Sequence, residues 1–251
     1  MKQLKQKCRF FLPDRPCVFH KEQGLTCQNC SHYQPGSGRL LIVKREALGD
    51  VLRTTALLQP LRKRFPEHRI IWLTARESQG LLKDNPWLDE VWTDDTPDTV
   101  ANLTFFQFEV VINLDLSRES LLLAGLPQAR TRIGFWYNPS GEIVCSGAAA
   151  ENWLLLSHDD RAKKHNKLSY QRWMADIIGL KQIGQIFVPL PDVSLEYARL
   201  FAEKYRLSGQ KVVGLNVGSG PAWVTKRWPE ANWLELTQHL EGEAVLLLLG
   251  G

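Results

Sequence analysis

Short apolar runs alternate with helical patterns along most of this chain. Five of the runs have strand length, and the first is rich in Val, Ile and Leu; they lie at residues 39–43, 69–74, 90–92, 109–114 and 130–135. Between them, apolar residues recur at helical spacing, as at residues 78–82 and 121–124. Strands that alternate with helices in this way are typical of a parallel sheet with crossover helices. The pattern therefore predicts an α/β fold.

The first unit, at residues 39–65, organises the chain. A strand of the buried type runs into a short turn that ends in Gly49, and Asp50 stands where a helix is predicted to begin. Apolar side chains then follow at helical spacing until Pro66 ends the helix; they are Val51, Thr55, Leu58, Leu61 and Phe65. In an open α/β sheet, ligands bind in the crevice beyond such a strand.

Two roles fit Asp50. An aspartate at the start of a helix commonly caps the free N–H groups of the first turn. An aspartate at the mouth of a cleft can instead act as a general base. The lone Gly49 does not complete the G-x-G-x-x-G fingerprint, which argues against a dinucleotide site.

A second α/β unit is predicted after a Pro-containing connection at residues 187–191. Its helix, strand, helix and strand are expected at residues 195–205, 211–216, 230–239 and 244–249. The first strand is followed by three residues that let backbone N–H groups approach a phosphate closely: Gly218, Ser219 and Gly220. Lys226 would add a full positive charge to this phosphate site. The alternative is that the loop is a simple turn between a strand and a helix and binds no phosphate. Because the chain then ends at Gly251, this second domain is expected to be incomplete.

The region between the two units has weaker patterns. Residues 138–152 are rich in turn-forming residues and are predicted to be irregular. The basic run at residues 161–165 is predicted to be a solvated turn, with contact to an anionic ligand as the alternative. Residues 166–178 have the apolar face of a helix, and their aromatic side chains are assigned to the core.

The composition and the charge of the chain are those of an ordinary globular protein. The chain has 251 residues, enough for two domains, with 44% hydrophobic and 23% charged residues. It has no apolar run near the roughly 18 residues that span a bilayer and no signal-peptide pattern, so a cytoplasmic location is expected. The net charge of +4 is carried by residues 1–38, which hold six basic and two acidic residues.

The basic head also contains four of the five cysteines, with the spacing C-x8-C-x9-C-x2-C: Cys8, Cys17, Cys27 and Cys30. A C-x2-C pair can place two thiolates on one metal ion, and the head has little apolar content with which to build a core. We therefore predict a structural zinc site, with an iron–sulfur cluster or unligated or disulfide-bonded thiols as alternatives. His20 and His32 are reserve ligands, and residues 34–38 are predicted to be a linker.

Two separated motifs resemble the heptosyltransferases of glycosyltransferase family 9. The first is the strand, the short loop with Gly49 and Asp50, and the helix at residues 39–55. The second is the strand and Gly/Ser loop at residues 213–220, followed by Lys226-Arg227-Trp228-Pro229 and Trp233. The motifs occur in the family's order, and the resemblance covers residues 39–251 but not the head.

The resemblance implies a GT-B fold, in which two Rossmann-like domains face a cleft. It divides the chain into a cysteine-rich head at residues 1–38 and an N-terminal acceptor domain at residues 39–185. A linker and the start of a nucleotide-sugar-binding domain, which is expected to be truncated, would occupy residues 186–251.

The resemblance also implies an inverting glycosyltransferase that transfers heptose from ADP-heptose to a hydroxyl of a lipopolysaccharide core. Asp50 matches the family's proposed catalytic base, which takes the acceptor proton. Lys226 and the loop at residues 218–220 would bind the donor diphosphate and stabilise it as a leaving group, so that catalysis requires no metal. Three further cations are candidates for holding the acceptor, with a surface role as the alternative: Lys44, Arg45 and Arg53.

The expected partners are a nucleotide sugar and a lipid-linked or glycan acceptor, which implies peripheral contact with the inner face of the cell membrane.

Two other functions fit the composition. A cysteine head with basic charge occurs in nucleic-acid-binding proteins, although the body has balanced charge and no basic stripe with interleaved aromatic residues. A non-catalytic nucleotide-binding module would fit a truncated second domain.

Overall fold

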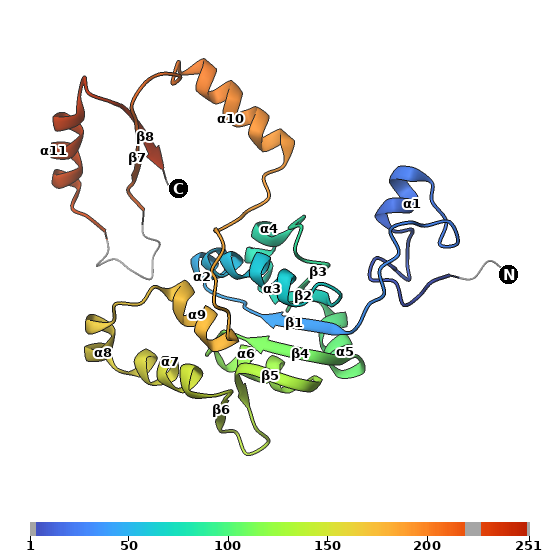
Figure 1. Cartoon of the computed structure of the whole chain (residues 1–251). Helices are drawn as coiled ribbons and strands as arrows, with labels where there is room; N and C mark the ends of the chain where they lie inside the picture. Colours follow the sequence, from blue (N-terminus) through green and yellow to red (C-terminus); the bar gives the residue numbers. More distant parts are fainter. Residues whose placement is uncertain (1–3, 219–226, 250–251) are drawn as a thin grey trace. The chain divides into compact units, whose positions relative to one another are not determined.

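The computed structural model describes residues 4–218 and 227–249 (Figure 1). The chain forms two compact units, Met1–Pro189 and Leu190–Gly251, of which the first contains the cysteine-rich head. Within the described residues, none of the helices combines the length and the apolar character needed to cross a bilayer.

A six-stranded sheet lies at the centre of the first unit, in the order β3-β2-β1-β4-β5-β6. Its strands are β1 (Arg39–Val43), β2 (Arg69–Thr74), β3 (Glu90–Thr93), β4 (Gln107–Asn113), β5 (Gln128–Tyr137) and β6 (Ile143–Cys145). The first five are parallel, and β6 is antiparallel to β5. In the register of the central strands, Leu40 faces Ile70 on one side and Val110 on the other. The five predicted strands and the α/β class are confirmed.

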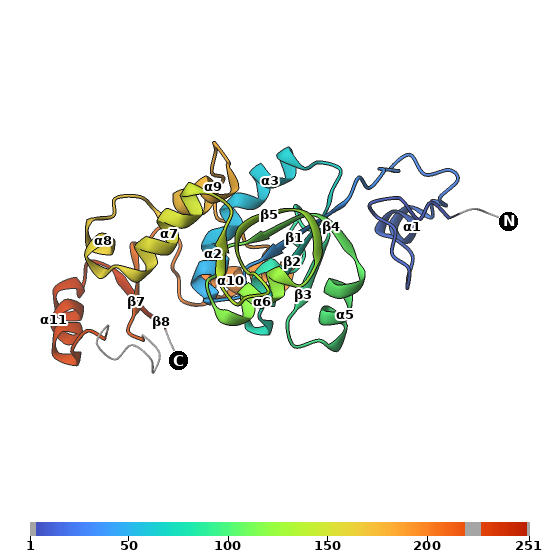
Figure 2. The ribbon, with the colours of Figure 1, turned by 90° about the horizontal axis from the view of Figure 1, so that it is seen from below.

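Helices cover both faces of this sheet (Figure 2). Leu40 and Ile42 of β1 pack into one apolar cluster, to which α3 (Leu58–Arg64) and α9 (Tyr170–Ile178) contribute. Leu41 and Val43 point to the opposite face, where α5 (Pro97–Phe105) contributes Leu103 and α6 (Arg118–Gly125) contributes Ala124. Because successive residues of a strand face opposite sides, an unbroken apolar run such as that of β1 is what a sheet covered on both faces requires.

The helix predicted to start at Asp50 is divided in two. It consists of α2 (Leu48–Thr54), a 3₁₀ turn at Thr55–Leu57, and α3. Pro60 in α3 has no N–H group to donate to the carbonyl of Ala56. That carbonyl instead accepts a hydrogen bond from the N–H of Gly184 at 2.9 Å, so the break also fixes a distant loop.

Two predictions for the middle region are wrong. Residues 138–152, expected to be irregular, contain β6 and the start of α7 (Ala148–His158). The basic run at residues 161–165 lies on a helix, α8 (Asp160–His165), and not on a turn. The carboxylate of Asp159 accepts hydrogen bonds from the N–H groups of Arg161 and Ala162, so an N-cap outside the basic run starts this helix.

The remaining elements are short or belong to the second unit. The first unit also has α1 (Val18–Gln23), a 3₁₀ turn at Arg76–Ser78 and α4 (Gln79–Leu82). The second unit contains α10 (Asp192–Lys204), β7 (Val212–Asn216), α11 (Glu230–Leu240) and β8 (Val245–Leu249). Strands β7 and β8 are parallel, with Val212 opposite Val245, so the predicted strand–helix–strand step is confirmed.

Candidate active site

The candidate site lies where β1 and β4 end side by side in the middle of the first sheet. From β1 the chain continues to β2 on one side, and from β4 it continues to β5 on the other. This reversal of strand order is a topological switch point, the place where open α/β sheets bind ligands. A shallow pocket of about 280 Å³ opens there, lined by the loops after the two strands and by the start of α2, together with Trp153, Ser157 and Tyr170.

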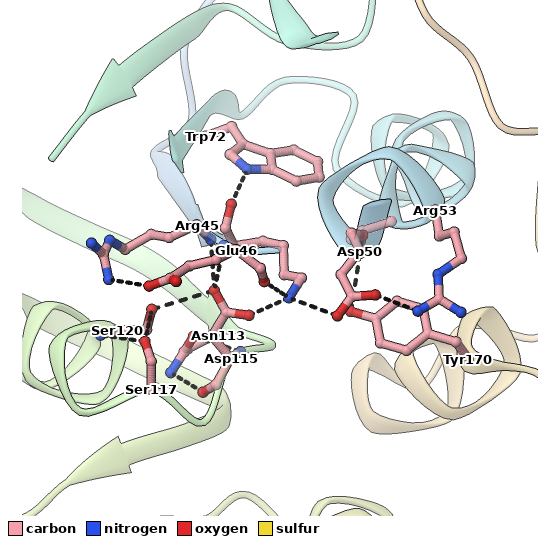
Figure 3. A network of polar contacts seen from close by, with 12 residues as sticks. Arg45, Glu46, Asp50, Arg53, Trp72, Asn113, Asp115, Ser117, Ser120 and Tyr170 are labelled. Carbon is pink, nitrogen blue, oxygen red and sulfur yellow. Dashed lines mark hydrogen bonds and ion pairs between the residues drawn. The ribbon is translucent and has the colours of Figure 1, made fainter. Parts of the chain in front are cut away.

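Asp115, two residues after β4, holds the loop that follows β1 (Figure 3). Its buried carboxylate accepts hydrogen bonds from the Lys44 ammonium, from the Arg45 N–H at 2.6 Å and from the Glu46 N–H at 3.4 Å. Asn113 in turn fixes Asp115, because its Oδ1 accepts from the Asp115 N–H and its Nδ2 donates to the Asp115 carbonyl, each at 3.0 Å. The ends of β1 and β4 are thereby joined by one hydrogen-bonded network.

Lys44 is the charged centre of this network and is only 2% exposed. Its Nζ donates to Asp115 and lies 4.0 Å from Oδ2 of Asp50. Trp72 donates its indole N–H to the carbonyl of Lys44 at 2.9 Å, which fixes the backbone at the end of β1. Burial alone would lower the pKa of Lys44, but the charge and hydrogen bond of Asp115, together with the electrostatic effects of Tyr170 and Asp50, outweigh burial and raise it. The ammonium is therefore a permanent positive charge beneath the pocket.

Asp50 presents its carboxylate to the pocket from the first turn of α2. Its side chain is 34% exposed, and Oδ1 forms an ion pair with Arg53. The helix starts at Leu48 with Ala47 as its N-cap, so the capping role weighed for Asp50 is wrong. Asp50 is instead a half-exposed carboxylate held between two cations, Lys44 and Arg53.

Tyr170, the first residue of α9, forms the other wall beside Asp50 (Figure 3). Its hydroxyl is 3.3 Å from the Thr54 hydroxyl, and the Arg53 guanidinium lies over its ring at 4.3 Å. Trp153 packs edge-on against the same ring, with the centroids 5.8 Å apart. Burial raises the pKa of Tyr170, although the charge of Lys44 opposes the rise. Tyr170 thus stays a neutral phenol at neutral pH.

The structure separates the three cations that were considered for the acceptor. Arg45 is 6% exposed, and its guanidinium is held by carboxylates, including Asp94 at 2.6 Å from Nε and Glu119 at 2.6 Å from Nη2. Burial lowers the pKa of Arg45, but its bonds to these carboxylates outweigh burial and raise it. Lys44 is also buried and paired, whereas the side chain of Arg53 is 44% exposed beside the pocket. Only Arg53, of these three, offers an accessible cation to an acceptor.

The donor-side prediction falls mostly outside the described residues. Ser219, Gly220 and Lys226 are not among them, and Gly218 follows β7 in a loop. The role of these four residues at a donor phosphate stays a prediction.

The four head cysteines line a single cavity, together with His20 and His32. None of the chain's five cysteines forms a disulfide. Across residues 4–218 and 227–249, no group of three or more His, Cys, Asp or Glu side chains is arranged to hold a metal ion. The zinc site at Cys8, Cys17, Cys27 and Cys30 stays a prediction.

Comparisons with known proteins show which solved structures share this fold. A lipopolysaccharide core heptosyltransferase, OpsX of Haemophilus influenzae, is 26% identical over 110 residues, which are 41% of this chain and 31% of OpsX. A glycosyltransferase family 9 protein of Veillonella parvula superposes with a TM-score of 0.55 over 86% of this chain, at 16% identity. E. coli heptosyltransferase WaaC, solved with ADP, gives 0.54 over 85% at 16% identity.

The chain has the fold of glycosyltransferase family 9. E. coli ADP-heptose lipopolysaccharide heptosyltransferase II adds a third structure with a TM-score of 0.51 at 19% identity, over 85% of this chain. The chain spans 63% of the Veillonella structure, 67% of WaaC and 64% of heptosyltransferase II. No protein-family model matches the chain. The predicted GT-B-like architecture is therefore supported at the level of the fold.

Proposed function

We propose that this protein is a heptosyltransferase-like enzyme that transfers heptose from ADP-heptose to a lipopolysaccharide core or a related glycan, with inversion. The observation that carries the proposal is the position of Asp50: a half-exposed carboxylate at the switch point of a glycosyltransferase family 9 fold. The similarity to OpsX, and the ADP-bound structure of WaaC, support the donor and acceptor classes.

In this proposal, Asp50 is the general base. An acceptor hydroxyl attacks the anomeric carbon of the donor, its proton passes to the Asp50 carboxylate, and the bond from the anomeric carbon to the diphosphate breaks. The products are the inverted glycoside and ADP. The Lys44 ammonium, 4.0 Å away, faces this carboxylate from beneath the pocket.

The leaving diphosphate would be stabilised by Lys226 and the backbone N–H groups of residues 218–220, in place of a metal ion. Arg53 would hold the acceptor, since its guanidinium is accessible beside Asp50. Closure of the two domains would bring donor and acceptor together.

We further propose that the reaction takes place in the cytoplasm, with peripheral contact to the inner face of the membrane. The head supports this placement, because its six basic and two acidic residues would be attracted to anionic headgroups.

Two measurements test the proposed function. In a thermal-shift panel, ADP and ADP-sugars should stabilise the protein more than UDP- and GDP-sugars do, because binding to the folded state alone raises the melting temperature. With ADP-heptose and a truncated core acceptor, mass spectrometry should detect one added heptose, and NMR should show the inverted anomer. Equal stabilisation by all nucleotide sugars, together with no transfer, would contradict the proposal.

A further inference from the structure

A second, larger cavity lies between the head and the body, at the end of the sheet where the strands begin. Its volume is about 1160 Å³, which is large enough for a small organic molecule. The head contributes residues 11–15 to its walls, and the body contributes the first residues of β1 and β2 together with β3. It shares no lining residue with the pocket at Asp50, which follows the opposite end of β1. The cavity is therefore separate from the candidate active site.

Arg39, the first residue of β1, carries an unpaired positive charge in the wall of this cavity. Its partly buried guanidinium lies over the ring of Phe106, 4.2 Å from the centroid, and makes neither a hydrogen bond nor an ion pair with any residue that the structure describes. Arg69 is its neighbour in the strand register. Burial and the charge of Arg69 lower the pKa of Arg39, and Glu90 only partly opposes them. An anion bound to Arg39 would offset both effects.

The nearest carboxylate, Glu90, is already engaged on both oxygens. Its Oε1 forms an ion pair with Arg69, and its Oε2 accepts a hydrogen bond from the indole N–H of Trp92 at 2.9 Å. Arg69 also donates to the carbonyl of Phe11 in the head at 2.9 Å. These contacts hold Glu90 and Arg69 to each other and leave the Arg39 guanidinium without a counter-ion.

The other charged groups in the wall are paired or offset. Asp89 forms ion pairs with two arginines outside the cavity wall, at 2.7 and 2.6 Å. Asp14 lies 3.8 Å from Arg15. Lys83 and Asp84 are adjacent, exposed and of opposite charge. The cavity therefore keeps one partly buried positive charge that these groups do not neutralise.

The chemistry of the wall indicates which anion fits. A guanidinium binds phosphate and carboxylate with paired hydrogen bonds, and a phosphate monoester carries about 1.5–2 negative charges at neutral pH. Two adjacent arginines therefore favour the phosphate. Aromatic rings from both sides, including Phe11, Trp92 and Phe106, form an apolar surface beside it. We propose that this cavity binds a small phosphate monoester, with its phosphate on Arg39 and its organic portion against the aromatic rings.

The bound molecule would also hold the head against the body, because both line the cavity. Isothermal titration calorimetry on the whole chain tests the proposal, with phenyl phosphate as the probe and benzoate, the carboxylate analogue, at equal ionic strength. We expect one phenyl phosphate per chain and binding of benzoate at least about tenfold weaker. Phenyl phosphate should also slow cleavage of the head by a protease. Equal binding of the two anions, or no binding at millimolar concentration, would overturn the proposal.

Matched variants locate the site. Arg39→Gln should weaken phenyl phosphate binding at least about tenfold, because it removes a charge-assisted contact, and should abolish the protection from protease. Arg39→Lys keeps the charge and should bind more tightly than Arg39→Gln. Circular dichroism checks that both variants are folded.

Two controls distinguish the cavity from other cationic sites. Arg130→Gln removes a cation whose side chain is 78% exposed and does not line the cavity. Lys226→Ala removes the cation predicted to bind the donor phosphate. Both should bind phenyl phosphate with wild-type affinity. Wild-type affinity in Arg39→Gln, or a loss in Lys226→Ala as large as that in Arg39→Gln, would overturn the assignment to this cavity.

Discussion

The Lys44 ammonium lies 4.0 Å from the Asp50 carboxylate and is itself hydrogen-bonded to Asp115. One buried cation therefore faces two carboxylates, of which Asp115 is buried and Asp50 opens to the pocket. The pair with Asp115 fixes the cation in place, and the longer contact lets that charge act on the proposed base. The consequences of this arrangement can be measured in stability and in activity.

Replacement of Asp115 by Asn should be strongly destabilising. It leaves the Lys44 ammonium, 2% exposed, without its buried counter-charge, and breaking a buried pair in this way costs about 3–5 kcal/mol of unfolding free energy. Glu109→Gln is the matched control, because it removes an exposed pair with Arg130 at 3.0 Å and should change the stability little. Urea denaturation at neutral pH measures both, and equal losses would show that Lys44 does not depend on Asp115.

Tyr170→Phe should make stability less sensitive to alkaline pH. The pKa of Tyr170 is raised in the folded protein above its ordinary value of 10.0, mainly by burial. Below that value the phenol is neutral in both states; above it the unfolded chain releases the proton first, so stability falls as pH rises. Lys44, whose pKa is also raised, contributes a loss in the same direction above 10.5 in both proteins.

The measurement for Tyr170 is the urea midpoint followed from about pH 8 to about pH 11. The wild type should lose stability more steeply than Tyr170→Phe over the upper part of this range. Tyr33→Phe serves as the control, because it removes a phenol from the head, at a residue that is 38% exposed and outside the Lys44 network. An identical slope for Tyr170→Phe would mean that the phenol of Tyr170 is not held neutral by the fold.

Gly134→Ala should disrupt the junction between β4 and β5. Gly134 has a φ of +91°, and a Cβ there would lie 1.8 Å from the carbonyl oxygen of Asn113. Asn113 positions Asp115, so the clash would act directly on the network, with an expected cost of more than about 2 kcal/mol. Gly141→Ala is the control: its φ is +82°, but no atom lies within 4 Å of the added Cβ. If both variants lost the same unfolding free energy, backbone strain alone would explain the effect of Gly134→Ala, and the clash with Asn113 would play no part.

The sheet could be predicted because each strand is a short apolar run with a local signal. Residues 39–43 and 69–74 form β1 and β2 as expected, since a strand buried on both faces needs an unbroken apolar run. Helix α7 was missed because Gly147 and the alanines after it carry no clear helical period, and only Ala150 of this helix is fully buried. Helix α7 depends on packing against elements that are distant in the sequence, and a local pattern does not contain those contacts.

The site could be predicted only in part, for a similar reason. Asp50 was found through its own motif, and Lys44 and Arg53 were named because they lie within nine residues of it. Asp115 lies in the loop after β4 and Tyr170 begins α9, and only the sheet order and the packing of α9 bring them to Asp50. The sole local signal was the place of Asp115 just after a buried strand, which is where ligand-binding residues of α/β sheets lie.

The role of Asp50 as general base is the central claim, and Asp50→Asn tests it most directly. The measurement is the rate of heptose transfer from ADP-heptose, and the affinity for ADP is determined on the same samples. Glu46→Gln is the control, because Glu46 is a second carboxylate of the pocket. We predict that Asp50→Asn lowers the rate about 10²–10⁴-fold while ADP binds with wild-type affinity, and that Glu46→Gln stays within a few-fold of the wild type. Transfer by Asp50→Asn at the wild-type rate would contradict the account.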